Sequence, residues 1–183
     1  MSRKYKFHNL ESAYFISFAT VNWVDVFTRE IYFNILAESI TYCRKNKGME
    51  VYAYCIMSNH VHMVFRSMSG DPSGLLRDFK GFTSKELVKA IINNPKESRK
   101  ENLLKIFTNA GTANCNVEKY QFWQQNNQPI ELWSSDVIKQ KVNYIHMNPV
   151  KAGFVTKPTE WKYSSARNYE GDQTVLEIDL IRI

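Results

Sequence analysis

Two histidines and, far downstream, a tyrosine and an asparagine are the residues whose types and spacing could carry chemistry. His60 and His62 lie two apart in residues 60–66, HVHMVFR, a segment that alternates as a strand does. Because alternate residues of a strand face the same side, both imidazoles should leave one face while Val61, Met63 and Phe65 leave the other. Two neutral imidazoles that face one point form half of a divalent metal site. Two histidines at this spacing are by themselves a weak signal.

The tyrosine and the asparagine lie on an expected helix over residues 135–148. One apolar stripe of this helix is the obvious core face and consists of Ile138, Val142 and Ile145. A neighbouring stripe consists of Val137, Lys141, Tyr144 and Asn148. Tyr144 and Asn148 are one turn apart, so a phenol nucleophile could lie beside an amide metal ligand. The alternative is a tyrosine that packs on a sheet and an asparagine that caps the helix before Pro149, and spacing alone favours that alternative.

The elements that would position these groups alternate between strand and helix. Strands are expected at residues 15–20, 51–57, 60–66 and 120–123, and helices at 30–45, 72–93, 95–107 and 135–148. Ser134 or Ser135 can cap the last helix, and Pro149 should end it. This order predicts one α+β domain over residues 1–183: a ferredoxin-like antiparallel sheet with helices on one face and a site on the other. A helical insertion at about 95–117 would precede the last strand. A C-terminal extension would cover about 156–183, of which residues 171–183 would form a tail or an edge strand.

Composition and charge narrow the class of protein. The chain of 183 residues is 44% hydrophobic and carries a net charge of +6. Residues 139–167 hold one acidic residue, Glu160, and six basic ones: Lys139, Lys141, Lys151, Lys157, Lys162 and Arg167. This balance suits a phosphate-bearing partner, although a solvated surface would have the same composition. Cys43, Cys55 and Cys115 have no paired spacing and are expected to be reduced thiols. The polar, basic start indicates no membrane segment, and we expect a cytoplasmic, DNA-associated protein.

Four blocks of the sequence together resemble a known family. They are SNHVHMVF (58–65), FWQQNNQPIEL (122–132), YIHMNPVKAGFV (144–155) and WKYSSARNY (161–169). In this order they resemble the HUH-type single-tyrosine transposases, and most of all the REP-associated tyrosine transposases and their insertion-sequence relatives. The resemblance extends from about residue 14 to residue 169.

The resemblance implies an activity and a set of site residues. It implies a metal-dependent DNA endonuclease and strand transferase that cleaves and rejoins single-stranded, hairpin-bearing DNA through a 5′-phosphotyrosine. Tyr144 would be the nucleophile, and His60, His62 and Asn148 would bind Mg²⁺ or Mn²⁺. The better-known insertion-sequence members have Gln where this chain has Asn148, whose shorter side chain requires a closer helix. The sequence leaves the oligomeric state open: a homodimer is possible, since in the family's dimers the tyrosine helix of one copy can complete the partner's site, and the helical insertion here could change that arrangement.

Several further residues are candidates for smaller roles. Lys141 and Lys151 could bind DNA and could assist the tyrosine, because a phenol needs a nearby cation or base to attack; the alternative is that both are solvated surface lysines. A helix surface with Arg77, Lys80, Lys85 and Lys89 could follow a DNA hairpin stem, although ordinary helix surfaces look the same. His8 is expected at the surface, and His146 should pack or hydrogen-bond away from Tyr144. Trp123, Trp133 and Trp161 are expected in the core, although one of them could stack on an unpaired base.

Two other functions fit the same pattern. A non-catalytic nucleic-acid-binding module can use the same fold, and it would require paired aromatic residues on the open face of the sheet. A metal-dependent nuclease that uses water would share the metal site and leave Tyr144 without a role.

Overall fold

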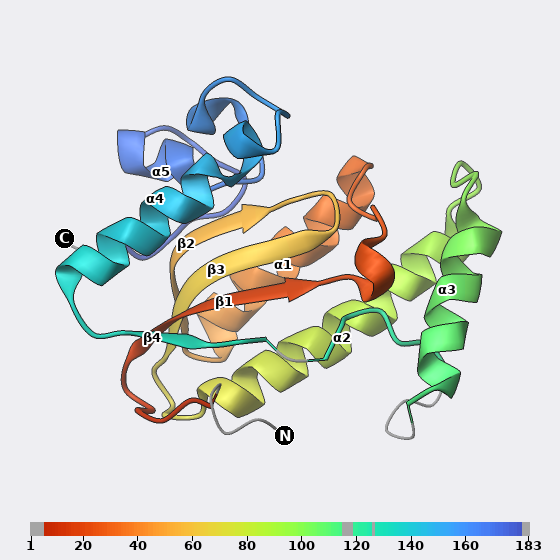
Figure 1. Ribbon diagram of the computed structural model, residues 1–183, viewed down its shortest axis with the longest axis horizontal. Coiled ribbons are helices and arrows are strands. Elements are labelled where there is room, and N and C mark those ends of the chain that lie inside the picture. Colours follow the sequence, from red (N-terminus) through yellow and green to blue (C-terminus); the bar gives the residue numbers. More distant parts are fainter. Residues whose placement is uncertain (1–5, 115–118, 126, 181–183) are drawn as a thin grey trace.

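The computed structural model describes residues 6–114, 119–125 and 127–180. Its centre is a four-stranded antiparallel sheet in the order β2-β3-β1-β4 (Figure 1). The strands are β1 (Ala13–Ala19), β2 (Met49–Ile56), β3 (His60–Ser67) and β4 (Ile130–Leu132). The expected hairpin of the second and third strands is present, and the strand order is that of a ferredoxin-like sheet. The predicted fold class is confirmed.

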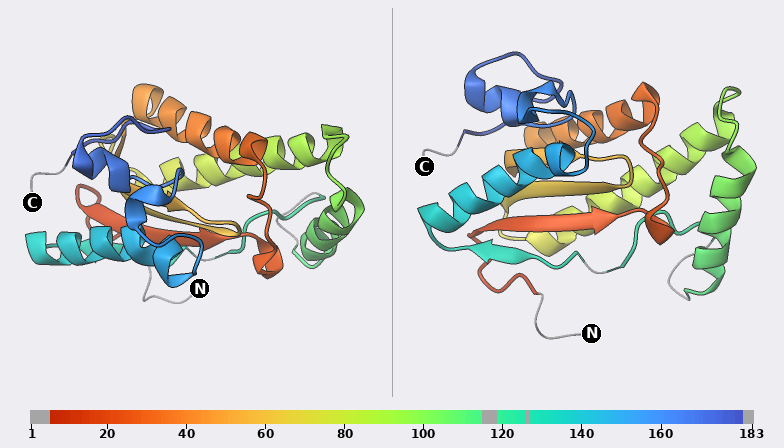
Figure 2. Two further views of the ribbon diagram at one scale, coloured as in Figure 1. Left: turned by 90° about the horizontal axis from the view of Figure 1, so that it is seen from above. Right: turned by 45° about the horizontal axis from the view of Figure 1, so that its top comes forward.

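The helices cover both faces of the sheet. α1 (Glu30–Asn46) and α2 (Pro72–Asn93) lie on one face, and α4 (Ser135–Lys151) crosses the other (Figures 1 and 2). The position of α4 differs from the expectation that the helices would share one face. The reason is apolar surface on the second face, where Phe15, Ala53 and Val64 pack against Val142 and Ile145 of α4.

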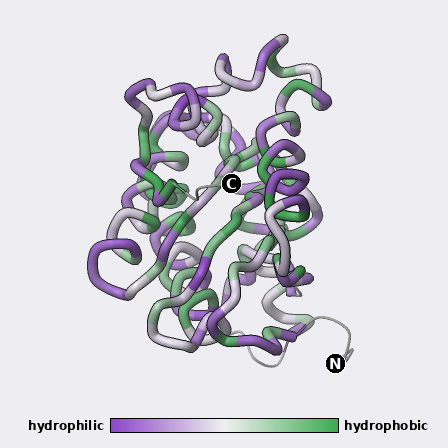
Figure 3. Tube along the Cα trace, turned by 90° about the vertical axis from the view of Figure 1, so that its left-hand side faces the viewer, coloured by the Kyte–Doolittle hydropathy of each residue, from purple (hydrophilic) through white to green (hydrophobic). Residues whose placement is uncertain are grey.

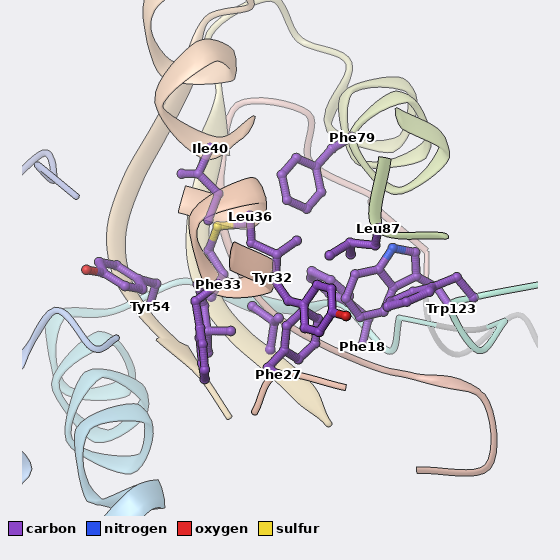
Figure 4. Close-up of a cluster of buried hydrophobic side chains, with 14 of the residues drawn as sticks. Phe18, Phe27, Tyr32, Phe33, Leu36, Ile40, Tyr54, Phe79, Leu87 and Trp123 are labelled. Atoms are coloured by element: carbon purple, nitrogen blue, oxygen red, sulfur yellow. The ribbon is translucent and has the colours of Figure 1, made fainter. Parts of the chain in front are cut away.

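The main core lies between the sheet and the pair α1 and α2. Phe18, Phe27, Leu36, Phe79 and Leu87 are among its members and are 2% exposed or less (Figure 4). Hydrophobic segments gather toward the middle of the molecule, and hydrophilic segments are most common at its periphery (Figure 3). Burial of this many large side chains is the main source of the stability that holds the sheet in place.

The predicted fourth strand at residues 120–123 is wrong. β4 lies several residues further along the chain and pairs with β1, with Ala13 opposite Leu132 and Phe15 opposite Ile130. Trp123 makes only an isolated bridge to Thr20, and its indole is buried in the core. The aromatic residues that suggested a strand are therefore core residues on an irregular segment.

The helical insertion contains α3 (Lys100–Thr112), and the predicted start at Pro95 is too early. Residues 94–99 instead form turns that are anchored by Glu97, which is 4% exposed. Its carboxylate accepts hydrogen bonds from Arg29 Nε at 3.1 Å, Arg99 Nε at 3.0 Å and Tyr32 Oη at 3.1 Å. Residues 115–118, which hold Cys115, lie outside the described residues; Cys43 and Cys55 are buried free thiols.

α4 begins as predicted and ends later than predicted. The Ser134 hydroxyl accepts a hydrogen bond from Val137 N, so Ser134 is the N-cap. Pro149 lies inside the last turn and does not end the helix, because few intrahelical bonds remain for it to interrupt. The end is a Schellman motif: Gly153, at φ 75°, donates to Val150 O, and Phe154 N donates to Pro149 O.

The C-terminal segment follows the free edge of β2. It contains η2 (Pro158–Glu160) and α5 (Ala166–Glu170). Ile56 N donates to Tyr163 O and Ser165 N donates to Tyr54 O, each at 2.9 Å. This segment satisfies edge groups that would otherwise be open to pairing with another chain. Among the helices of the described ranges, none is long and apolar enough to cross a membrane.

Glu97 provides a test of the turn before α3. Burial alone would raise the pKa of Glu97, but hydrogen bonds from Arg99, Arg29 and Tyr32 outweigh burial and lower it to about 2. We expect Glu97→Gln to lower the free energy of unfolding at pH 7 by about 2 kcal/mol, since hydrogen bonds to a charged group are lost. A free glutamate titrates near pH 4.3, so the ionised form stabilises the fold above that pH, and this contribution is lost as the pH falls toward 2.

Urea unfolding at several pH values measures this effect. The difference in the free energy of unfolding between the wild type and Glu97→Gln should decrease as the pH falls from about 5 to about 3. Glu38→Gln, at an exposed position on α1, is the matched control and should change stability by less than about 0.5 kcal/mol at every pH. A difference that stayed constant with pH would contradict the assignment of Glu97 as a buried anionic anchor.

Candidate active site

β3 presents both histidines to the face that α4 crosses. Val61, Met63 and Phe65 are 1% exposed or less on the opposite face, which confirms the predicted alternation. The ring centroids of His60 and His62 are 4.7 Å apart. His62 is 5% exposed and stacks on Phe15 of β1 at 5.6 Å, whereas His60 is half-buried. The two imidazoles therefore lie together at one edge of the covered face.

α4 brings Tyr144 and Asn148 to these histidines. The ring centroid of Tyr144 is 5.2 Å from that of His62, and Asn148 Nδ2 is 3.1 Å from His62 Nε2. Asn148 does not cap the helix, because α4 continues to Lys151 and its side chain is turned toward His62. Tyr144 remains 39% exposed. All four side chains come from one chain, so a single copy contains the whole cluster.

Burial keeps the imidazoles neutral. It lowers the pKa of His60, and burial together with the nearby His60 and Lys141 lowers the pKa of His62 to about 3. With the Asn148 amide in its present orientation, Nδ2 donates and His62 Nε2 accepts with its lone pair. Neutral imidazole is the form that binds metal ions.

The cluster offers two imidazole nitrogens and one amide as donors. An amide turned by 180° would place the oxygen of Asn148 where its nitrogen now lies. This mixed nitrogen and oxygen set fits a divalent ion such as Mn²⁺, and fits Mg²⁺ less well. Within the ranges that the structure describes, no three His, Cys, Asp or Glu side chains gather in a way that could hold a metal ion. The group beside the two histidines that could add an oxygen donor is the amide of Asn148.

Asn59 contacts His60 and was not predicted as a site residue from the sequence. Its Nδ2 donates to Trp23 O at 3.0 Å, which fixes the orientation of the amide. Its Oδ1, 2.8 Å from His60 Nδ1, can only accept, so the proton of His60 lies on Nδ1. His60 Nε2 is then left with its lone pair. A polar residue directly before the histidine pair was the only signal in the sequence.

Positive charge gathers around Tyr144. Lys141 Nζ is 5.8 Å from the centre of the Tyr144 ring and 5.0 Å from that of Phe15. Lys151 Nζ is also 5.8 Å from the Tyr144 ring. Lys141 and Lys151 are therefore the two candidate basic residues that lie at the site.

The other candidate basic residues lie elsewhere. Arg77 and Lys85 are exposed on α2, on the opposite side of the sheet from the histidines. The expectation for Lys80 requires correction, because its ammonium is used internally: it donates to Gln124 O at 3.0 Å and to Asn127 Oδ1 at 2.6 Å. Burial lowers the pKa of Lys80 to about 8. Lys80 ties α2 to the segment before β4 and is not a free surface cation.

The remaining aromatic and histidine predictions have mixed outcomes. His8 is exposed, and His146 lies 2.8 Å from Ser165 Oγ, away from Tyr144. Trp123 is buried, and Trp161 is partly buried and donates to Ile56 O. Trp133 is not in the core, because it is 78% exposed where the chain enters α4.

Comparisons with known proteins place the chain in a family. Residues 10–109, more than half of the chain, match the family model described as "Transposase IS200 like". The chain belongs to the IS200-like transposase family. It is 23% identical over 133 residues to the REP-associated tyrosine transposase of Escherichia coli (strain K12), a match that covers 73% of this chain and 64% of that protein. This chain thus spans less than two thirds of the curated relative.

A solved structure supports the fold. The REP-associated tyrosine transposase bound to a REP hairpin matches with a TM-score of 0.63 at 19% identity, over 100% of this chain and 95% of that one. At this identity the likeness establishes a shared fold and leaves the chemistry of the site to be argued from its own residues.

The proton on His60 Nδ1 can be tested directly. Nitrogen-15 NMR of the imidazoles should show His60 protonated at Nδ1 in the wild type, because Asn59 Oδ1 accepts that proton. We expect Asn59→Ala to shift His60 toward the other tautomer, and Asn59→Asp, which keeps an acceptor, to retain it. Asn143→Ala, at an exposed position on α4, is the control. An unchanged His60 spectrum in Asn59→Ala would exclude Asn59 as the group that positions the ring.

Proposed function

We propose that this protein cleaves and rejoins single-stranded, hairpin-bearing DNA through a covalent bond between Tyr144 and a 5′-phosphate. The observation that carries this proposal is the position of Tyr144. Its ring is half-exposed on a helix, 5.2 Å from a buried neutral imidazole and flanked by two lysines. A tyrosine that served only to pack would not need this combination of exposure and charge.

The reaction follows from the groups present. The phenol of Tyr144 loses its proton to solvent and its oxygen attacks phosphorus. The bond from phosphorus to the 3′-oxygen breaks, and that oxygen takes up a proton from solvent and leaves as a hydroxyl. The phosphotyrosine keeps the bond energy of the original diester, so a 3′-hydroxyl can attack it later and restore a DNA strand. Mg²⁺ or Mn²⁺ bound by His60, His62 and Asn148 would supply Lewis-acid polarisation of the phosphate. Lys141 and Lys151 would hold the phosphate oxygens beside the phenol.

The partner follows from the family and from the charge. The relative with the shared fold was solved with a REP hairpin, and we propose hairpin-bearing single-stranded DNA as the partner of this chain as well. Because the four site residues meet within one copy, each copy would work on its own DNA strand. A homodimer would then hold two complete sites and would not need to exchange the tyrosine helix.

The two rival functions differ in what they require. A passive binding module needs paired aromatic residues on an open sheet face, but here α4 covers that face and Phe15 stacks on His62. A nuclease that uses water needs the histidines and the asparagine but gives Tyr144 and its two lysines no role.

Tyr144→Phe separates all three functions. The change removes one oxygen and keeps the ring, so stability should change by about 1 kcal/mol or less. We expect the wild type to form a protein–DNA adduct with a labelled hairpin oligonucleotide and Mn²⁺, and the variant to form none, because no bond to phosphorus can form. Denaturing electrophoresis measures both the adduct and the cleaved strand.

Tyr42→Phe is the matched control, since Tyr42 is 57% exposed on α1 at the other face of the sheet. It should form the adduct at the wild-type rate. Equal cleavage by wild type and Tyr144→Phe would favour water as the nucleophile, and no cleavage by either would favour a binding module. An adduct that persisted in Tyr144→Phe would assign the nucleophile to another residue.

Asn148→Ala tests the metal ligands. We expect Mn²⁺ affinity to fall at least about tenfold, measured by titration calorimetry, because one of three protein donors is removed. The melting temperature without metal should change little, since Asn148 does not cap α4. Asn143→Ala on the same helix should bind Mn²⁺ as the wild type does. An unchanged affinity in Asn148→Ala would remove Asn148 from the ligand set.

A further inference from the structure

Trp23 is an exposed indole held beside the histidines by an unusual backbone. It ends η1 (Val21–Trp23), the short helix that lies beyond the end of β1 (Figure 1). Asn22 and Trp23 both have φ near 54°. Two consecutive residues other than glycine in the left-handed region are uncommon, and such strain persists only where the surroundings impose it.

The surroundings of Trp23 impose this conformation. Val21 N donates to Phe122 O at 2.8 Å, and Trp23 N donates to Thr20 O at 3.0 Å. Trp23 O accepts from the side chain of Asn59, the residue whose oxygen also bonds His60. Trp23 is nevertheless 55% exposed, and its ring centroid lies 5.5 Å from that of His60. The backbone is thus held in a costly conformation that leaves a large apolar surface open to solvent.

The rings at the site follow one another in a row. Trp23 contacts His60, His60 contacts His62, and His62 contacts Tyr144. Among the described ring contacts, none joins Trp23 to His62 or His60 to Tyr144. Trp23 and Tyr144 are therefore at opposite ends of the row.

Charge divides along the same row. Lys141 and Lys151 lie at the end with Tyr144. Among the described cation–ring contacts, none involves Trp23, so the feature that the other end of the row offers is an exposed indole. The positive charge of the two lysines favours a phosphate at the Tyr144 end, and the exposed indole favours a nucleobase at the Trp23 end.

We propose that Trp23 stacks on the base of the nucleotide immediately 5′ of the cleaved phosphate, the nucleotide that leaves with the 3′-hydroxyl. In an in-line displacement the leaving oxygen departs on the side opposite the nucleophile, which here is the Trp23 end of the row. An indole can stack on any base, so this contact would hold the released end without selecting its sequence. A held 3′-hydroxyl stays close to the phosphotyrosine that it must attack when the strand is rejoined. This inference rests on the proposed function, because Tyr144 as the nucleophile is what places Trp23 on the leaving side of the broken bond.

The test combines a protein change with a DNA change. The variants are Trp23→Ala, Trp23→Phe and the control Trp133→Ala, which removes an even more exposed indole from the entry to α4. The probe is the tightest-binding oligonucleotide selected by the wild type from hairpins with randomised single-stranded flanks. Binding is measured without divalent metal, so that no strand is cut, and an abasic site is moved through each flank position in turn. The cleaved bond is mapped separately with Mn²⁺.

We expect Trp23→Ala to weaken binding ~5- to 150-fold, the range for loss of one stacked base. Trp23→Phe should recover part of this loss, and Trp133→Ala should bind within about twofold of wild type. An abasic site just 5′ of the cleaved bond should weaken the wild type by a similar factor and weaken Trp23→Ala no further. Circular dichroism and melting curves of each variant verify its fold.

Three results would overturn the inference. The first is that every abasic site weakens binding by Trp23→Ala as much as it weakens binding by the wild type. The second is that the two changes are coupled only at a position 3′ of the cleaved bond, and the third is that Trp133→Ala loses as much affinity as Trp23→Ala. If the wild type forms no adduct, the proposed function fails and the assignment to a leaving nucleotide fails with it. In that case, an abasic position whose effect disappears in Trp23→Ala would still establish a base-binding site at Trp23. If no abasic position behaves in this way, the base-binding site is excluded as well.

Discussion

The alternation of side chains along β3 is the constraint on which the site depends. Val61, Met63 and Phe65 are sealed into the core between the sheet and α1 and α2, so β3 cannot slip by one residue without exposing all three. The same register fixes His60 and His62 on the opposite face, next to Ala19 and Ser17 of β1. The hydrophobic core therefore sets where the two imidazoles lie, far more firmly than any polar contact could.

α4 covers apolar surface and carries the candidate site residues Tyr144 and Asn148 on the same face of the sheet. A helix with 3.6 residues per turn can do both, because neighbouring stripes face slightly different directions. Val142 and Ile145 cover Phe15 and Val64, while Tyr144 and Asn148 lie on the next stripe, above the imidazoles. The Schellman motif then lets the helix run one turn past Asn148, and this last turn brings Lys151 beside Tyr144.

Local periodicity accounts for most of what the sequence could predict. The helix over 72–93, the hairpin of β2 and β3, and the shared face of the two histidines all depend on spacing within a few residues, and all are confirmed. β4 was missed because three residues carry almost no pattern, and only pairing with distant β1 makes them a strand. Lys80 was misjudged because its partners, Gln124 and Asn127, are more than forty residues away. The meeting of α4 with β3 depends on tertiary packing, and spacing alone therefore favoured a cap for Asn148, which the structure does not show.

The left-handed conformation of Trp23 had no signal in the sequence, because turns of this kind are usually marked by glycine and here none is present. Such a conformation costs roughly 1–3 kcal/mol per residue, and the core around Phe122 and Thr20 is what sustains it. Asn59 is the link between this strained turn and the chemistry, since one amide bonds both Trp23 O and the His60 ring. A substitution that relaxed the turn would free that amide to rotate, and the proton on His60 would lose its acceptor. The side chain of Asn59 therefore joins the backbone of η1 to the ring of His60.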